Sequence, residues 1–226
     1  MVSSEVFQRA RSPQQKAVRR AAILDAAARL GAAKGVRVVS LGDIANEVGL
    51  TKSNVLRYFE TREDIYLQLT AAGYRDWADR VTRGLDGIRI VGPAEVGTVL
   101  AESLAADPLF CDLVSEGAAA LEHNVSPDAV RAFKRTLFEA IDDLADVLAT
   151  RSVHLAPEQA AEVLTATIIL TAGLWPWCNP PPVLAELYRT DPEVVRTRIE
   201  FVPQLRRLIE VVVRGLIADG RLPVAD

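Results

Sequence analysis

Residues 40 to 58 of the chain read SLGDIANEVGLTKSNVLRY, and this stretch decides the fold of the N-terminal part. Leu41, Ile44, Ala45 and Val48 recur at positions i, i+3, i+4 and i+7. This spacing places four apolar side chains on one face of a helix. The stretch is therefore expected to begin with a short amphipathic helix over residues 41–48.

Short polar residues and a glycine mark the end of that helix and the start of a second one. Ser40 and Asp43 have the S-x-x-D spacing of a helix N-terminus. Gly49 stands where a left-handed residue commonly ends a helix. Leu50 is expected to fill the corner, and Thr51 to cap the second helix. The sequence therefore predicts two short helices joined by a tight turn.

The second helix, expected over residues 52–59, has an apolar side and a cationic side. Val55 and Phe59, four residues apart, are expected to face inward, with Lys52 and Arg57 on the opposite face. Two short helices joined by a glycine turn, with a cationic outer face on the second, are typical of a helix-turn-helix. The alternative is a packed helical hairpin whose charged face meets only solvent.

Side chains on and around this outer face suit contacts with DNA. Lysine and arginine reach phosphates or guanine, asparagine suits adenine, and hydroxyl groups reach phosphate oxygens or base edges. Arginines of the neighbouring helices are expected to flank the groove and contact the DNA backbone, which adds affinity more than sequence preference. The candidate DNA-binding residues are Arg19, Arg20, Ser40, Thr51, Lys52, Ser53, Asn54, Leu56, Arg57, Tyr58 and Arg62.

The charge of the chain is divided unequally along its length. Residues 1–60 hold 10 Lys and Arg against 5 Asp and Glu, a net of +5, whereas residues 61–226 hold 16 against 25, a net of −9. A basic head on an acidic body suits a protein of which one end meets a polyanion. Chance clustering of the charges is the alternative.

Helix signals recur along the rest of the chain, and strand signals do not. Proline follows a capping or turn residue at Pro93, Pro108, Pro127, Pro157 and Pro192, where its fixed φ suits the first turn of a helix. Pro203 is a point at which the last helix can break. Helices are expected over residues 14–34, 41–48, 52–59, 62–83, 94–106, 108–122, 127–150, 157–176, 183–189 and 192–218.

The sequence thus predicts an all-α protein of two domains. The first is a three-helix DNA-binding domain with a helix-turn-helix over residues 14–62, preceded by a flexible arm over residues 1–13. The second is a C-terminal helical bundle over residues 63–226. A stripe of apolar residues between Val130 and Leu148, at near-heptad spacing, is expected to form part of the bundle core.

The run RAAILDAA from Arg20 and the run VSLGDIANEVGLTKSNVLRYFETREDI from Val39 resemble the DNA-binding domain of the TetR family of transcriptional regulators. The resemblance covers about residues 16–66 and is specific, because several features recur together at the right spacing. It implies a dimer that binds a palindromic operator in double-stranded DNA, with a regulatory helical domain. Leu56, where many members have tyrosine, and the acidic Glu60 depart from the family, so the operator does not follow from the resemblance.

The resemblance also implies a pocket for an unidentified small-molecule effector among the helices of the C-terminal domain. Large or polar side chains are the candidates to line it, with ordinary packing as the alternative for each. The candidate ligand-binding residues are Tyr74, Trp77, Phe110, Glu116, His123, Asn124, Phe133 and Trp175. The region has no nucleotide-binding glycine motif and no metal-ligand cluster, so no cofactor and no metal is expected.

Two late helices are candidates for the dimer contact. Residues 157–176 and 203–218 carry more apolar surface than a monomer exposes comfortably. In TetR-like proteins the two late helices pair with their copies as a four-helix bundle, and these two are the matching candidates. The alternative is packing within one chain.

These features predict a repressor that leaves its operator when a small molecule binds. The alternatives are an activator or effector-independent regulator, a non-specific architectural DNA binder and, with least support, an enzyme using the C-terminal cavity. No catalytic spacing is recognisable among the two histidines and two cysteines, so an enzyme is not expected. A secretory signal and an apolar run of about 18 residues are not recognisable either, so a cytoplasmic protein without a membrane partner is expected.

Overall fold

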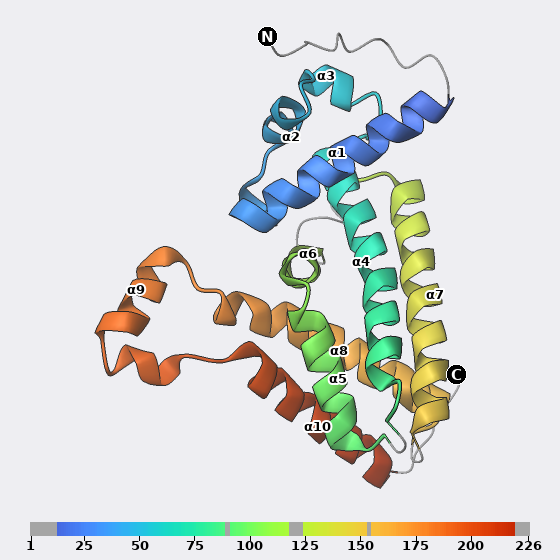
Figure 1. The fold of residues 1–226 in the computed structure, drawn as a ribbon, viewed down its shortest axis with the longest axis vertical. Coiled ribbons are helices and arrows are strands. Elements are labelled where there is room, and N and C mark those ends of the chain that lie inside the picture. Colours follow the sequence, from blue (N-terminus) through green and yellow to red (C-terminus); the bar gives the residue numbers. More distant parts are fainter. Residues whose placement is uncertain (1–12, 89–90, 118–123, 153–154, 220–226) are drawn as a thin grey trace.

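The computed structural model describes residues 13–88, 91–117, 124–152 and 155–219, and within them the chain is helical apart from loops and one isolated β-bridge. Figure 1 shows a small head, a long helix that leads from it, and a body of crossing helices. The predicted all-α class is confirmed. The arm predicted over residues 1–13 lies outside the described residues except for Pro13, which begins the first helix.

The head contains three α-helices and a 3-10 turn around a small apolar core. These elements are α1 (Pro13–Lys34), η1 (Val36–Val38), α2 (Leu41–Glu47) and α3 (Lys52–Val55). Ile23 of α1, Ile44 of α2 and Val55 of α3 are fully buried, and Phe59 just after α3 is nearly so. The inward faces predicted for the two short helices are thus confirmed.

Local hydrogen bonds hold the two short helices in place. The Ser40 hydroxyl accepts the Asp43 N–H at 3.2 Å, and the Asp43 carboxylate accepts the Ser40 N–H at 2.8 Å, which completes a capping box at α2. Gly49 has a φ of 66°, the left-handed conformation that a residue without Cβ adopts at little cost. The Leu50 N–H then donates to the Ala45 carbonyl at 2.8 Å, which closes the turn.

α3 is shorter than predicted, because it ends at Val55 rather than at residue 59. The chain continues in turns in which the Tyr58 and Phe59 N–H groups both donate to the Val55 carbonyl, at 2.9 and 3.2 Å. One carbonyl oxygen thus accepts hydrogen bonds from two amide groups. The tightened turn directs Phe59 into the core.

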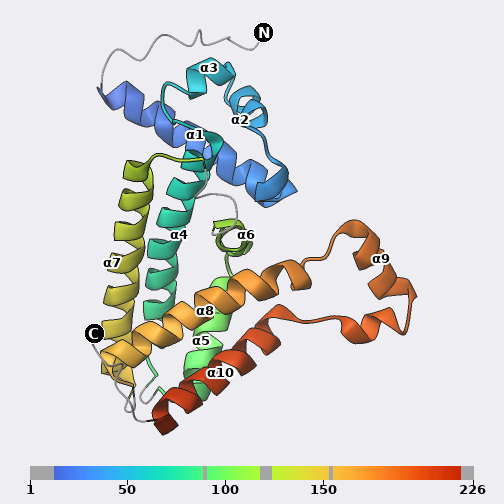
Figure 2. The ribbon, with the colours of Figure 1, turned by 180° about the vertical axis from the view of Figure 1, so that it is seen from behind.

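α4 (Arg62–Leu85) connects the head to the body and lies along α7 (Pro127–Arg151), as both views in Figures 1 and 2 show. Thr61 caps α4 by accepting the Asp64 N–H at 3.0 Å. Phe133, Leu144 and Leu148 of the α7 stripe are buried, as predicted. The two helices form one wall of the body.

Four further body helices pack on this wall or on one another. They are α5 (Pro93–Ala105), α6 (Pro108–Glu116), α8 (Pro157–Cys178) and α10 (Phe201–Asp219). α10 packs mainly on α5 and α8, and α6 packs on α8. α5, α6, α7 and α8 each begin with the proline predicted for the first turn.

The single helix predicted over residues 192–218 is wrong. Asp191 accepts the N–H groups of Glu193 and Val194 at 2.8 and 3.2 Å, and this closes only the short turn η3 (Val194–Thr197). α10 then begins at Phe201, so that Pro203 lies in its first turn, where the missing N–H breaks no ladder bond. α9 (Pro182–Thr190) precedes η3, and both elements project from the body between α8 and α10 in Figures 1 and 2.

α8 ends at Cys178, two residues beyond its predicted end, and is strongly apolar. By length and composition alone it is the one helix among the described residues that could cross a membrane. In the structure it packs against α6, α7 and α10, and the buried Thr167 and Thr171 hydroxyls donate to carbonyls one turn earlier, both at 2.8 Å. Ile169 remains 67% exposed. This apolar surface also suits contact with another protein chain.

Candidate nucleic-acid interface and ligand region

The outer face of the helix-turn-helix is exposed as a unit. Val55 is the one residue of α3 that is buried, and it anchors the helix on the head. The exposed residues from the start of α3 to the turn after it are Thr51, Lys52, Ser53, Asn54, Leu56 and Arg57. The structure therefore brings the predicted central set together on one surface, with two cations, one amide and two hydroxyls available to a polyanion.

The hydroxyl groups at the two helix starts already make bonds within the head. Thr51 accepts the Asn54 N–H at 3.3 Å and lies 3.0 Å from the Ser53 hydroxyl. At Ser40, hydrogen bonds from the hydroxyl and the backbone N–H hold the pKa of the Asp43 carboxyl below its ordinary value. Both caps thus fix the helix N-termini whose amides are suited to phosphate.

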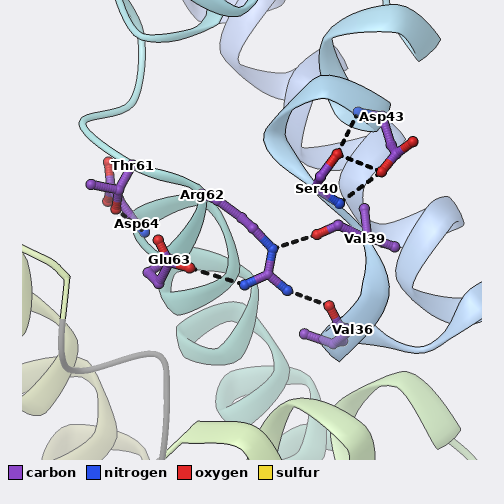
Figure 3. Close-up of polar contacts among 8 residues, drawn as sticks. All are labelled: Val36, Val39, Ser40, Asp43, Thr61, Arg62, Glu63 and Asp64. Atoms are coloured by element: carbon purple, nitrogen blue, oxygen red, sulfur yellow. Dashed lines mark hydrogen bonds and ion pairs between the residues drawn. The ribbon is translucent and has the colours of Figure 1, made fainter.

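Arg62 was predicted to contact the DNA backbone, and in the structure its guanidinium makes hydrogen bonds within the head (Figure 3). Its guanidinium donates to the Val36 and Val39 carbonyls and pairs with Glu63 at 3.0 Å. Its charged carbon also lies 4.8 Å from the centre of the Tyr66 ring. Arg62 thereby ties the start of α4 to the segment before α2, and a contact with DNA stays a prediction.

Arg20 makes a similar internal bridge from α1. Its guanidinium donates to the Tyr58 carbonyl and to the Gln68 side chain at 2.7 Å, and lies 4.2 Å from the centre of the Phe59 ring. Gln68 in turn donates to the buried Asp64 at 2.8 Å. The bridge holds the chain after α3 onto α1 and α4.

The other two flanking candidates are partly exposed. Arg19 is half-buried on α1, on the wall of a hollow of about 410 Å³ beside the α2–α3 turn. Tyr58 is half-buried after α3. Their contacts with DNA also stay predictions.

One residue that links the head and the body was missed from the sequence. Asp112 of α6 accepts the Val36 N–H at 2.7 Å. A carboxylate of the body and the Arg62 guanidinium of α4 thus both bind the backbone of Val36. The two partners lie 76 residues apart, and no local pattern pairs them. α6 also packs against η1 and α1.

Four of the predicted ligand-binding residues form one aromatic cluster between α4, α6 and α7. The Tyr74 and Phe110 rings meet edge to face with centres 5.1 Å apart. Phe133 lies 6.3 Å from Tyr74, and Trp77 lies 6.3 Å from Phe110. All four are buried, and the Trp77 indole donates to the Ser103 hydroxyl at 3.0 Å. The cluster fills the body interior in this structure.

The other four predicted ligand-binding residues do not join this cluster. Trp175 packs edge to face on Phe201 of α10, with ring centres 4.9 Å apart. Glu116 is half-buried at the end of α6, and Asn124 is exposed before α7. His123 lies outside the described residues.

The body also has an open groove of about 380 Å³ between α4 and α7. Its walls carry Arg75 and the carboxylates of Asp79, Glu139 and Asp143, and Arg75 donates to Thr136 at 2.9 Å. Within the described part of the chain, no three His, Cys, Asp or Glu side chains are grouped to hold a metal ion.

Both cysteines are free thiols. Burial and, to a smaller extent, the charge of the nearby Asp107 raise the pKa of the Cys111 thiol to about 12. Cys111 is therefore a packing residue of α6, and its sulfur lies 3.3 Å from the Leu104 carbonyl.

Several solved structures resemble this chain in fold. FadR from Thermus thermophilus in complex with lauroyl-CoA has a TM-score of 0.56 at 17% identity, over 92% of this chain and 97% of that chain. FadR from Bacillus subtilis in complex with stearoyl-CoA has a TM-score of 0.52 at 16% identity, over 86% and 98%. The multidrug binding protein EbrR, complexed with imidazole, has a TM-score of 0.52 at 20% identity, over 92% and 97%. Among proteins with curated descriptions, no sequence matches.

Family profiles match both parts of the sequence. Residues 23–69 match the bacterial regulatory proteins of the tetR family, and residues 71–220 match the tetracyclin repressor-like C-terminal domain. The two matches meet within α4, the helix shared by head and body. The chain therefore belongs to the TetR family of DNA-binding transcriptional regulators, which is not a family of enzymes.

Proposed function

We propose that this protein is a homodimeric repressor that holds a palindromic operator through α3 and is released by a small-molecule effector bound in the body. The observation that carries the proposal is the exposed face of α3, where Lys52, Asn54 and Arg57 stand together on a helix anchored by the buried Val55. Such a face fits the major groove, where lysine, arginine and asparagine distinguish base edges. Repression acts where the DNA lies, in the cytoplasm.

A symmetric dimer supplies the second recognition helix. Four residues of α3 contact too few base pairs to select one site in a genome, and a two-fold pair reads two half-sites about 34 Å apart. Ile169 of α8 and Val211 of α10 are apolar and exposed, at 67% and 47%. These two helices, predicted as the dimer contact over residues 157–176 and 203–218, are the proposed interface.

The aromatic cluster is the proposed effector region. It lies against α4, and α4 continues into the head, where Arg62 and Asp64 hold the segments around α2 and α3. A ligand that enters between Tyr74, Phe110 and Phe133 has to displace at least one ring. It then favours a different position of α4 and weakens operator binding by its differential affinity for the two states.

The close packing of the cluster also favours a second candidate, a regulator without an effector. The four aromatic side chains are each at most 7% exposed and contact one another. A core that stays closed leaves α4 in one position. The ligand experiment below separates the two candidates.

Selection of bound DNA from a random duplex pool tests the DNA-binding part. We expect the full-length dimer to enrich a palindrome and to prefer it over unrelated duplex by about 10³-fold or more. Sedimentation of the free protein measures the oligomeric state. A monomer that binds all duplexes equally at low salt would contradict the proposal.

Release of the selected operator tests the effector part. FadR proteins of the same fold were solved with lauroyl-CoA and stearoyl-CoA, so these two compounds and an apolar library are suitable probes, with coenzyme A alone as the control. A compound that raises the operator dissociation constant and fails to do so in a Phe110→Ala variant supports ligand-relieved repression. Tight binding of a compound without any change in operator affinity would favour the effector-independent regulator.

A further inference from the structure

The arm formed by α9 and η3 stands away from the rest of its own chain. It leaves the body at the end of α8 and returns at the start of α10, and both views show it projecting to one side (Figures 1 and 2). α9 packs on η3, and neither element has a buried residue. The arm therefore gains little stabilisation from the monomer.

The arm nevertheless carries an apolar face. Val183 and Leu187 lie one helical turn apart on α9 and are 72% and 41% exposed, and Val195 of η3 is exposed as well. A helix of nine residues is marginal in water without tertiary packing. The face is thus suited to a second surface that covers it.

Symmetry indicates which surface lies beside the arm. In the proposed dimer both heads face the same DNA, and we therefore place its two-fold axis along the direction from body to head, which is vertical in Figure 1. α9 and α7 lie on opposite sides of this direction in both views. A half-turn about it exchanges the two sides, and it places each arm on the side of the partner where α7 lies.

α7 presents a fitting surface there. Phe138 is 61% exposed in a hollow of about 340 Å³ on this helix. Arg131 and Arg135 line one end of the hollow, and Asp142 lines the other. On α9, Glu186 and Arg189 flank Leu187 and pair with each other on the free arm. Glu186 and Arg189 on α9 are thus suited in charge to a hollow that has basic and acidic residues at its two ends.

We propose that α9 of each protomer docks on the outer face of the partner's α7, with Val183 and Leu187 covering Phe138. This contact rests on the proposed dimer and extends it, because it joins the arm between α8 and α10 to the helix that packs on α4. The dimer is then held at three places, by the α8 and α10 bundle and by two exchanged arms.

Cysteine pairs test the contact directly in full-length protein. In a Cys178→Ser background, chains with Leu187→Cys are mixed and re-equilibrated with chains carrying Phe138→Cys, and mild oxidation follows. We expect a disulfide-linked heterodimer from the mixture and none from either variant alone. Leu187→Cys mixed with Val38→Cys is the matched control, because Val38 is 67% exposed in the head.

A second variant measures the strength of the contact. Leu187→Asp places a charge in the apolar face and is expected to weaken dimerisation on the order of tenfold or more in sedimentation. Val38→Asp is expected to leave the dimer unchanged.

The outcomes separate this inference from the proposed function. A wild-type dimer that binds the selected operator, with no cross-link between positions 187 and 138 and no effect of Leu187→Asp, would overturn the arm contact alone. In a protein that carries both Leu187→Cys and Phe138→Cys, a disulfide that forms only within one chain would also contradict the contact. A wild-type protein that is monomeric and does not select DNA would overturn the dimer itself.

Discussion

Two kinds of arginine stand in the head, and their contacts distinguish them. Arg57 lies exposed on the outer face after α3, whereas the guanidinium groups of Arg20 and Arg62 donate to backbone carbonyls of the same domain. A guanidinium that bridges two carbonyls holds the shape of the head. One that is exposed beside Lys52 is available to phosphate or guanine.

Lys52→Ala and Arg57→Ala are each expected to weaken operator binding without unfolding the protein. Loss of one phosphate contact lowers the slope of log affinity against log salt by about 1, and loss of a bidentate guanine contact costs about 1–3 kcal/mol. A salt titration of operator affinity separates the two roles. Arg37→Ala, exposed in η1, is the control. Unchanged operator affinity and an unchanged salt slope in both variants would show that α3 does not lie in the DNA groove.

Arg62→Ala is expected to act first on stability. Removal of its guanidinium leaves the Val36 and Val39 carbonyls without these bonds and Glu63 without its ion-pair partner, at a cost of about 1–3 kcal/mol. Urea unfolding measures this loss, and Arg57→Ala serves as the matched control with little change. Equal stability of the two variants would show that the bridge does not hold the head.

At the scale of elements, α5 and α10 approach each other unusually closely. A Cβ at Gly97 of α5 would lie 2.8 Å from the Arg206 carbonyl of α10. The absence of a side chain at this point lets the two helices make the most extensive contact between elements of the body. The position of α10, and with it one half of the proposed dimer interface, depends on this glycine.

Gly97→Ala is expected to destabilise the protein by about 1–3 kcal/mol, because the added methyl group forces the two helices apart. In an open helix the same change stabilises by about 0.5–1 kcal/mol, so the sign of the effect is diagnostic. Thermal unfolding measures it, with Glu102→Ala on the exposed side of α5 as the control. A stabilised Gly97→Ala protein would contradict the close approach.

At the scale of the whole molecule, α4 and α6 both join the head to the body. α4 passes from one to the other, and α6 reaches the head through Asp112, whose carboxylate holds the Val36 N–H. Arg62 holds the carbonyl of the same residue. A displacement of either α4 or α6 therefore reaches the segment that leads into α2.

Asp112→Ala is expected to loosen the head on the body. The N–H of the buried Val36 loses its acceptor, which costs about 1–3 kcal/mol. We expect faster hydrogen exchange at Val36 and a lower midpoint of thermal unfolding. Asp76→Ala, an exposed aspartate of α4, is the control. Unchanged exchange at Val36 would show that the carboxylate does not protect this amide.

The sequence by itself determined the all-α class, the caps of α2 and α3, the left-handed Gly49 and the inward Val55 and Phe59. These features are local, since each bond or face joins residues at most four apart. A pattern of that range can be read without the fold.

The tertiary structure alone decided which side chains meet across the chain. The guanidinium of Arg62 donates to Val36 and Val39, and that of Arg20 donates to Tyr58 and Gln68, all of which lie 23 to 48 residues away in the sequence. The projection of α9 from the body between α8 and α10 is likewise visible only in the tertiary structure. Packing between elements that are distant in the sequence decides these contacts and positions. The helical period of 3.6 residues predicts which face of a helix is buried, but not which element packs against that face.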